Sequence, residues 1–587
     1  MKGYKLLFVF CLSLVLNEVS AQVSYQQQYL NAKSLFESGK NQLAMEAFKP
    51  LMKKEEGNPF AAYASFYYAV AAYRDGYLPM AKNMFLQVKQ TFPGWSKTNE
   101  VNFWLGKVYF ELEEYNQGLN ALKDIKDRGF EEDVRNLKYY AFGKIADVKQ
   151  MKMLQENNPN DRVLGEMLAH AIAKQPLVNQ DQQMLDRLIK KFNLDEKGLE
   201  RVKVDKSEFK DSYKVAVLFP FLINKLDIDT RKKVNQLVLD IYLGMKLATD
   251  SLQAQGVKLE MYAYDTKRDS VSTSRLLEMD EMKGMDLIIG PFFPEPRNVV
   301  QEFSFKNKIN MISPLSLDSD VIGTNPYSFL IHPTYETLGR CMADYVDKHA
   351  RNKKSIIFYG DNKRDSTLAY AYKERIEQHG FEVVINKEIG KQNTREILDI
   401  LVGSGRIKDA ASDAARSAYK VSPNSVGHIF VASNNDLISS KVISAVDTRG
   451  DSIMVVGSAD WLELPVINYE VYQRLGTVMY APMYIQKETE AYERFRKSYV
   501  EKHRVPPTQY AAIGYDLMML MGNSLNDHGK YFQLGWNKQK MMKGYLSMGY
   551  SFEHSQDNNL VPVIEFADEG LELKYEIEEI KNDDSKE

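Results

Sequence analysis

The chain has 587 residues, a formal net charge of −3 and 44% hydrophobic residues. This length predicts several domains with cores of their own. The nearly balanced charge and the lack of a basic stripe exclude a nucleic-acid-binding protein, and we expect no nucleic-acid partner.

The N-terminus has the pattern of a secretion signal. Lys2 and Lys5 precede an apolar run over residues 6–16, and small residues at 19–21 offer a cleavage site. The run is too short to span a membrane, and no other run of 18 apolar residues follows. We expect residues 1–21 to be a signal peptide of a secreted, periplasmic protein without a transmembrane segment in its mature form. The alternative is a buried first helix.

The two cysteines add to this interpretation. Cys11 lies inside the apolar run, directly after Phe10, so its position does not support lipid anchoring. Removal of the signal leaves Cys341 alone, which excludes an internal disulfide in the mature chain. A disulfide-free secreted protein suits a bacterial periplasm.

Residues 25–127 contain an internal repeat of 37 residues, with small and aromatic residues at matching positions. The matching sets are Ala32, Ala69 and Gly106; Phe36, Tyr73 and Phe110; Ala44, Ala81 and Gly118; and Phe48, Phe85 and Leu122. Small residues let paired helices approach closely while large ones fill the space between them. The pattern resembles tetratricopeptide-type helical hairpins, whose usual period is about 34 residues. The alternative is a plain helical bundle.

We therefore predict an all-α tetratricopeptide-like superhelix over residues 22–194, in which the helices of 131–193 cap the repeats. Its concave face, with exposed tyrosines and basic residues, could bind a peptide, although most of these tyrosines are expected to pack between helices. Residues 195–212 are charged and poor in large apolar residues, which predicts a linker.

From residue 213 onward, strand-like apolar runs alternate with amphipathic helix patterns. This alternation predicts a parallel, doubly wound α/β sheet with right-handed crossovers. In such sheets ligands bind at the carboxyl ends of the strands. Those ends carry Pro220, Asp265, residues 290–291 and residues 313–314.

Several segments resemble type I periplasmic binding proteins. They are Val-Leu-Phe-Pro-Phe (217–221), Ile-Ile-Gly-Pro (288–291), Ile-Ser-Pro (312–314), Asn-Pro-Tyr-Ser-Phe (325–329) and the late helix 510–519. The resemblance implies a two-lobed α/β domain over residues 213–575, followed by a charged tail, 576–587. It places lobe 1 at about 213–332 and 478–545, and lobe 2 at about 333–477 and 546–575. Several crossings between the lobes would form a hinge.

The resemblance also implies the ligand-contacting positions of the cleft between the lobes. In lobe 1 they are Phe221, Asp265, Phe292, Phe293, Ser313, Ser316 and Leu317, and in lobe 2 Tyr359, Asp361, Ser433, Asn434, Asn435, Asp460 and Trp461. Aromatic side chains with a few polar groups are typical of a small-molecule cleft.

The cleft loops differ from those of the amino-acid binders in this family. The resemblance implies that such binders hold the ligand carboxylate with Ser or Thr hydroxyls and free backbone amides. Residues 290–296 read Gly-Pro-Phe-Phe-Pro-Glu-Pro, in which the prolines have no N–H and the phenylalanines no hydroxyl. Residues 313–317 carry Leu where Ala and Thr are common. These departures argue against free amino acids as ligands, although Asp460 could still bind an amine.

Motifs of catalysis and metal binding are absent from the sequence. The eight histidines are more than fifteen positions apart, which gives no zinc-ligand spacing. No Gly-Lys pair continues with Ser or Thr, and no Gly-x-Ser-x-Gly occurs. We predict no catalytic residue, metal or cofactor. An enzyme would need two carboxylates facing each other in the cleft.

The order of the domains resembles that of the periplasmic activators of penicillin-binding proteins, which bridge the outer membrane to a peptidoglycan synthase. The missing lipid-attachment cysteine is a departure from that family. The first hypothesis is therefore a non-enzymatic cell-envelope regulator or scaffold that binds an envelope protein through its helical repeats. The alternative is a solute receptor for an amino acid, peptide or related small molecule, serving an ABC transporter or a sensor.

Overall fold

The computed structural model describes residues 24–196, 198–199, 206–223, 235–403, 421–422, 424–450, 452–464, 467–567 and 570–574. The chain divides into two compact units, Met1–Lys174 with Asp181–Arg201, and Gln175–Gln180 with Val202–Glu587. The predicted signal peptide with Cys11, the tail 576–587 and part of the predicted linker lie outside the described residues.

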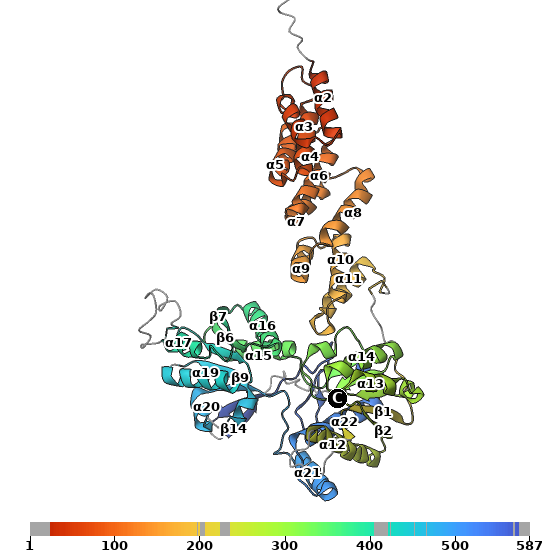
Figure 1. Cartoon of the computed structure of the whole chain (residues 1–587), viewed down its shortest axis with the longest axis vertical. Coiled ribbons are helices and arrows are strands. Elements are labelled where there is room, and N and C mark those ends of the chain that lie inside the picture. The colour runs from red at the N-terminus through yellow and green to blue at the C-terminus, as the bar shows by residue number, and fades with distance from the viewer. Residues whose placement is uncertain are drawn as a thin grey trace, which may run out of the picture. The chain divides into compact units, whose positions relative to one another are not determined.

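The first unit is all-helical, and its successive helices pack against one another (Figure 1). Its helices are α2 (Tyr25–Glu37), α3 (Asn41–Phe48), α4 (Ala61–Arg74), α5 (Leu78–Thr91), α6 (Thr98–Glu111), α7 (Tyr115–Lys123), α8 (Glu131–Phe142), α9 (Val148–Asn157), α10 (Arg162–Ala173) and α11 (Gln182–Phe192).

The 37-residue repeat corresponds to the hairpins α2–α3, α4–α5 and α6–α7. The small residues lie where the two helices of a hairpin touch, and Ala32 and Ala69 are fully buried. At the equivalent position in the third hairpin, a Cβ on Gly106 would lie 2.7 Å from Leu122 Cδ2. The repeat therefore reflects close helix packing, and the helical fold predicted for this region is confirmed.

The second unit consists of two lobes, each built on its own sheet (Figure 1). The five strands of lobe 1 are all parallel, in the order β2-β1-β3-β4-β5. Strands and helices of this lobe are β1 (Tyr213–Phe219), α12 (Gln236–Ala254), β2 (Leu259–Asp265), α13 (Ser270–Leu277), β3 (Leu287–Ile289), α14 (Pro294–Asn307), β4 (Asn310–Ser313), β5 (Ser328–Leu330), α21 (Glu490–His503), α22 (Gln509–His528) and α23 (Gln533–Trp536).

Lobe 2 has a sheet in the order β14-β13-β10-β9-β8-β6-β7, in which only the pairs of β13 with β10 and with β14 are antiparallel. Strands and helices of this lobe are α15 (Tyr335–His349), β6 (Lys354–Gly360), α16 (Lys363–Gln378), β7 (Glu382–Ile389), α17 (Arg395–Leu401), β8 (His428–Ala432), α19 (Asp436–Arg449), β9 (Met454–Ser458), α20 (Tyr469–Leu475), β10 (Val478–Tyr480), β13 (Val563–Ala567) and β14 (Gly570–Lys574). The predicted two-lobed α/β class is confirmed.

One predicted lobe assignment is wrong. Residues 549–552 were expected in lobe 2, but β12 (Gly549–Tyr550) pairs with β11 (Met542–Lys543). Tyr550 and Phe552 are buried in the core of lobe 1, where the Phe552 ring stacks on Trp536 with 4.2 Å between ring centroids. Burial of these two rings keeps the chain in lobe 1 until after Phe552, so it crosses later than predicted.

Three crossings join the lobes: residues 331–334 after β5, residues 481–489 after β10, and residues 553–562 before β13. Hydrogen bonds tie the crossings to each other. Leu330 N donates to the Gln556 carbonyl and Ala481 N to the Pro562 carbonyl, both at 2.9 Å. The buried Asp557 carboxylate accepts from Thr334 N at 2.7 Å. The crossings therefore form one hydrogen-bonded hinge.

Candidate functional site

The carboxyl ends of the parallel strands adjoin the hinge in both lobes, because β5 and β10 continue directly into crossings. Most of the predicted ligand contacts follow these strand ends. The loop after β4 also reaches lobe 2, since Leu317 packs against its core and the Leu317 carbonyl accepts from Tyr335 N at 3.0 Å. The facing edges of the two sheets are therefore the candidate site.

Asp265 holds the loops after β1 and β2 in place. Its carboxylate accepts from the backbone amides of Leu222 at 3.1 Å, Ile223 at 3.2 Å and Lys267 at 3.0 Å. Leu222, Lys267 and Arg268 all have positive φ angles, of 51°, 53° and 65°. Such conformations cost free energy for residues other than glycine and need support from their surroundings. Asp265 supplies this support, so its carboxylate is engaged by the backbone.

The three phenylalanines predicted for the lobe 1 contacts have different environments. Phe221 is buried, and the ring of the half-buried Phe292 lies 4.6 Å from that of Phe219 in the core. Phe293 is also half-buried, and the guanidinium carbon of Arg268 lies 4.6 Å from its ring centroid. This cation–π contact fixes a positive charge at the carboxyl edge of lobe 1.

The two predicted serines of lobe 1 have different environments. Ser313 is buried at the end of β4, and the Ser316 hydroxyl accepts from Asp318 N at 3.0 Å. Asp318 in turn pairs with Arg297 at 3.4 Å. Ser316 therefore supports the loop that touches lobe 2.

Several lobe 2 residues predicted as contacts are buried in its core. Trp461 is 1% exposed, its ring fills the space that a Cβ on Gly457 would need, and its N–H donates to the Ser433 carbonyl at 3.2 Å. Ser433 and Tyr359 are also buried, and the Tyr359 hydroxyl lies 3.3 Å from that of Tyr370. This hydrogen bond and burial raise the pKa of Tyr359 to about 12.

The remaining predicted residues of lobe 2 lie at its surface. Asn434 and Asp460 are exposed and joined by a hydrogen bond from the Asn434 amide to the Asp460 carboxylate. Asp361 is also exposed, and the Asn435 side chain caps α19 by accepting from Leu437 N at 3.0 Å. The structure therefore brings Asn434 and Asp460 together at the carboxyl edge of lobe 2.

Three further residues of this edge were not predicted: Tyr335, Asp365 and Tyr480. Asp365 is half-buried beside Gly360, burial raises its pKa, and it bonds to Ser433 and Asn362. Burial likewise raises the pKa of Tyr335; the charge of Arg364 opposes this, and those of Asp365, Asp318 and Asp460 add to it. The same two carboxylates act on the buried Tyr480, whose pKa burial raises well above its usual value.

The sequence gives no sign that Asp365 or Arg268 belongs to the site. Both lie one or more residues beyond a strand end, and their partners are distant in the chain. The two consecutive left-handed residues at 267–268 are visible only in the backbone conformation. Arg268 thus lies at the edge of lobe 1, and the carboxylates of Asp365 and Asp460 lie with Arg364 at the edge of lobe 2.

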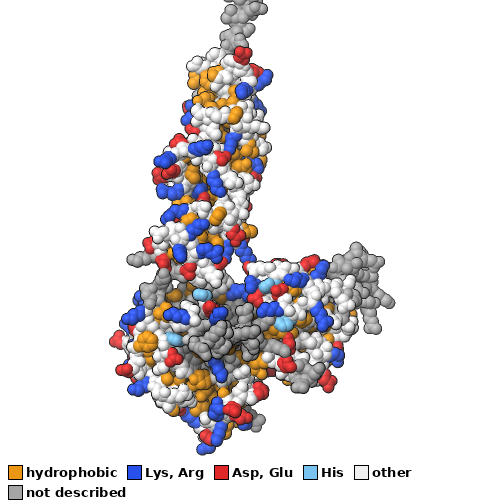
Figure 2. Space-filling view, turned by 180° about the vertical axis from the view of Figure 1, so that it is seen from behind, with side chains coloured by type: hydrophobic (Ala, Val, Ile, Leu, Met, Phe, Trp, Pro, Cys, Tyr) orange, Lys and Arg blue, Asp and Glu red, His pale blue; other side chains and the backbone are white. Residues whose placement is uncertain are grey.

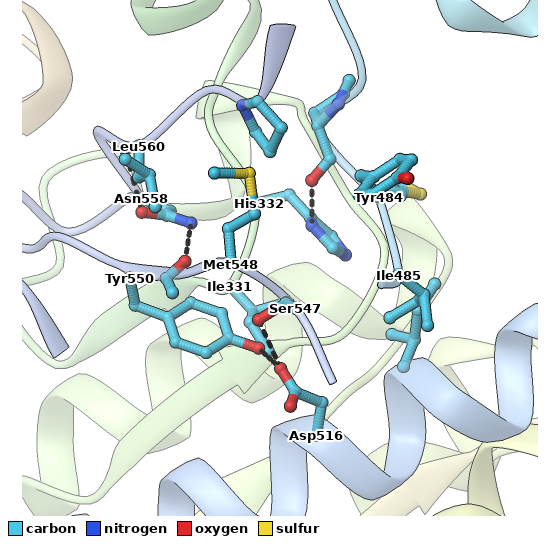
Figure 3. A pocket seen from close by; sticks show the side chains of 15 residues that line it. Ile331, His332, Tyr484, Ile485, Asp516, Ser547, Met548, Tyr550, Asn558 and Leu560 are labelled. Atoms are coloured by element: carbon cyan, nitrogen blue, oxygen red, sulfur yellow. Dashed lines mark hydrogen bonds between the residues drawn. The ribbon is translucent and has the colours of Figure 1, made fainter. Parts of the chain in front are cut away.

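A small cavity lies at the hinge, where segments of all three crossings meet (Figure 3). Its volume of about 20 Å³ suffices for one water molecule and is too small for an organic ligand. One wall is held by Asp516 of α22, whose buried carboxylate accepts from Tyr545 N, Leu546 N and the hydroxyls of Ser547 and Tyr550. His332 of the first crossing points into the same cavity.

Within the described residues, no three His, Cys, Asp or Glu side chains are placed so that they could hold a metal ion. None of the helices in the described ranges has the length and apolar composition that crossing a bilayer would need. Burial raises the pKa of Cys341 to about 12, so its thiol is protonated and unreactive at neutral pH.

Comparison with known families identifies both parts of the chain. Residues 241–580, more than half of the chain, match the receptor family ligand binding region. Residues 17–151 match a tetratricopeptide repeat-like domain. A comparison with curated proteins finds no match.

Solved structures with a similar fold include three binding proteins. An ABC transporter substrate-binding protein from Desulfitobacterium hafniense in complex with Leu is 16% identical, over 62% of this chain and 100% of that chain, with a TM-score of 0.43. A putative branched-chain amino acid ABC transporter protein from Rhodospirillum rubrum is 14% identical over the same shares, with a TM-score of 0.47. A branched-chain amino acid transporter substrate-binding protein from Streptococcus pneumoniae, in complex with isoleucine, is 16% identical over the same shares, with a TM-score of 0.37.

The family match begins within α12 and continues through the last strands of lobe 2, which includes all three crossings and every strand of the two sheets except β1. The chain therefore belongs to the receptor family of ligand-binding regions, with the type I periplasmic binding fold, and carries a tetratricopeptide-like helical unit before it.

Proposed function

We propose that the second unit is a non-enzymatic solute receptor that binds a small zwitterion, an amino acid or short peptide, between its lobes. The observation that carries this proposal is a cation held on one edge and two carboxylates on the other. Arg268 lies on the edge of lobe 1, and Asp365 and Asp460 lie on that of lobe 2. A zwitterion could bind Arg268 through its carboxylate and the two carboxylates through its amine.

The carboxylate end of the ligand would rely on a side chain instead of backbone amides. Pro291 and Pro314 remove two N–H donors from the loops after β3 and β4, and Pro294 and Pro296 remove two more from the first turn of α14. A guanidinium offers several donors in one plane and binds carboxylates through two parallel hydrogen bonds. Arg268 therefore supplies the donors that the prolines remove, which answers the argument from sequence against amino-acid ligands.

The amine end would lie at Asp460, with Asp365 behind it. Asp460 is exposed, and among the described residues its carboxylate accepts from one side chain, the neutral Asn434, so its charge is available to a ligand. The Tyr335 ring next to these carboxylates adds an aromatic surface, which favours a positively charged group.

A thermal-shift screen tests the proposal, using each of the twenty amino acids together with its amide and its deaminated acid. The amide lacks the carboxylate and the deaminated acid lacks the amine. The best amino acid should raise the melting temperature more than either analogue, because each analogue loses one charged contact. At a hundredfold excess over its dissociation constant, a ligand stabilises the folded protein by about 2.7 kcal/mol.

Two variants test which residue contacts each end of the ligand. Arg268→Gln should erase the preference for the amino acid over its amide, and Asp460→Asn should erase the preference over the deaminated acid. Glu490→Gln on α21 is the matched control, because its side chain is 90% exposed and far from both edges in sequence. Equal shifts for all three ligand forms in the unchanged protein would contradict the proposal.

A second candidate function is binding of a cell-envelope protein by the helical unit, as in a periplasmic regulator or scaffold resembling the activators of peptidoglycan synthases. On the face seen in Figure 2, Lys and Arg side chains are interspersed with hydrophobic ones over this unit. Three cations belong to the helices α2, α4 and α6, and a fourth follows α8. Each lies over an aromatic ring of one of these four helices: Lys33 over Tyr67, Arg74 over Phe36, Lys107 over Tyr73 and Trp104, and Lys144 over Tyr140.

We refer to these four cations and their rings as the cation–aromatic stripe. Lys33 and Lys144 are paired with Glu37 and Glu111. Arg74 and Lys107 form no ion pair with any residue in the described ranges. Two unmatched positive charges beside aromatic rings favour an acidic segment of a partner protein.

The double variant Arg74→Glu, Lys107→Glu should weaken binding of a fluorescein-labelled peptide of alternating glutamate and leucine by about tenfold or more, because it reverses both unmatched charges. Fluorescence anisotropy at two salt concentrations measures the effect. Lys40→Glu, Lys126→Glu is the control, since both side chains are exposed cations of the same unit outside the stripe. An equal loss of peptide affinity in both double variants would show that binding depends on the total charge of the unit, which would contradict a specific binding surface.

A further inference from the structure

His332 lies at the centre of the hinge and uses one of its two ring nitrogens. The side chain is only 6% exposed, and Nδ1 lies 3.1 Å from the Pro482 carbonyl of the second crossing (Figure 3). A carbonyl oxygen can only accept, so the proton of the neutral ring is on Nδ1. Nε2 is then an acceptor that needs a donor.

No donor among the described residues reaches Nε2, which is a buried nitrogen without a hydrogen-bond partner. The Pro314 carbonyl, in the loop after β4, also interacts with the ring. A buried acceptor without a donor costs free energy, so Nε2 needs a proton from a water molecule or must carry one itself.

The hinge cavity provides the space for such a water. Its volume of about 20 Å³ exceeds the roughly 10–15 Å³ that one water requires. Three other polar side chains on its wall are already paired: Ser547 and Tyr550 donate to Asp516, and Asn558 donates to the Gly549 carbonyl. Nε2 is a buried acceptor on this wall to which a water in the cavity would bind, beside the half-buried Tyr484.

We propose that the cavity binds one water, which donates to His332 Nε2, and that protonation of Nε2 removes the acceptor for this water and loosens the hinge. The water would lie where residues of all three crossings line the cavity. This inference extends the proposed receptor function to the motion of its lobes but does not depend on which ligand binds.

The groups around His332 determine the sign of the pH effect. Asp516, Tyr484 and Tyr550 line the cavity, and Asp557 contacts Thr334 in the same crossing. The Asp516 carboxylate already accepts from four donors, and Asp557 accepts from Thr334 N and Ser555 Oγ, so neither is free to pair with a charged imidazole. Burial accordingly lowers the pKa of His332 from 6.5 to about 4.

A hinge arrangement that exposes His332 to water would keep its ordinary pKa and take up the proton more readily. The closed packing is therefore fully favoured above pH 6.5 and loses this advantage as the pH falls from 6.5 to about 4. The difference of these two values corresponds to a roughly 300-fold increase in hinge opening well below pH 4, and to about half of that at pH 4, where half of the closed molecules carry a protonated His332.

Hydrogen exchange followed by mass spectrometry on the full chain tests this mechanism. Peptides containing Leu330 and Ala481 report the hinge, because the amides of both residues bond across crossings. Peptides from β1 report global unfolding. After correction for the chemical exchange rate, hinge exchange should rise by roughly 100-fold between pH 7 and pH 4, beyond any rise in β1.

His332→Asn keeps a donor for Pro482 and cannot titrate, so its hinge exchange should not rise. His332→Gln is a second non-titrating variant in case the first does not fold. His428→Asn is the matched control at a buried histidine of lobe 2, whose pKa burial lowers to about 3, and it should retain the hinge response. An unchanged rise in the His332 variants, or a crystal structure at pH 7.5 with no water at Nε2, would overturn the proposal.

Discussion

Replacing Asp516 with alanine is expected to lower the free energy of unfolding of the second unit by about 3–5 kcal/mol. The carboxylate is 1% exposed and accepts two backbone amides and two hydroxyls from residues 545–550. Its removal leaves these four donors buried without an acceptor and opens a space beside the hinge cavity. The segment that follows α23 would lose its attachment to α22.

Urea denaturation followed by circular dichroism measures this change. Asp527→Ala is the matched control, because Asp527 is an exposed carboxylate near the end of the same helix, and its loss should change stability by less than about 0.5 kcal/mol. Similar values for the two variants would show that the four hydrogen bonds to Asp516 are not formed in the folded protein.

The second large effect is expected for Gly514→Ala, which should destabilise lobe 1 by about 3 kcal/mol. Helices α12 and α22 cross in direct backbone contact, and each has a glycine at the crossing. A Cβ on Gly514 would lie 2.1 Å from the Ile241 carbonyl oxygen, and one on Gly244 would lie 2.0 Å from that of Ala511. Backbone atoms cannot rotate away, so an added methyl group forces the helices apart and exposes the core of lobe 1.

Gly284→Ala is the control for this prediction. Gly284 ends the 3₁₀ helix Asp280–Gly284, its φ is not in the left-handed region, and no atom lies within 4 Å of the position of an added Cβ. The same methyl group should therefore be tolerated within about 0.5 kcal/mol. If Gly514→Ala is equally tolerated in thermal unfolding, the close crossing of α12 and α22 is wrong.

The sequence predicted the fold well because the fold depends on local and periodic patterns. The 37-residue spacing of Ala32, Ala69 and Gly106 reflects helices in direct contact, and short apolar runs such as 215–219 and 428–432 correspond to buried strands. The late crossing after Phe552 was missed because its cause is the stacking of this ring on Trp536, a contact that no local pattern reveals.

The candidate site was less predictable because its residues have partners far away in the chain. A position after a strand end does not distinguish an exposed carboxylate from one that binds backbone amides. Asp460 remains exposed, whereas Asp265 supports amides 42 and 43 positions earlier in the chain. Trp461, one residue after Asp460, fills the space above Gly457. Which of these side chains reaches a ligand depends on tertiary packing.

Calorimetric titration of the full chain and Asp460→Asn, each with the best amino acid of the screen and with its deaminated acid, tests the central claim most directly. If the ligand amine contacts Asp460, the substitution should weaken binding of the amino acid by about tenfold or more and leave binding of the deaminated acid unchanged. Equal effects on both ligands, or no binding of any amino acid, would contradict a zwitterion site between the lobes.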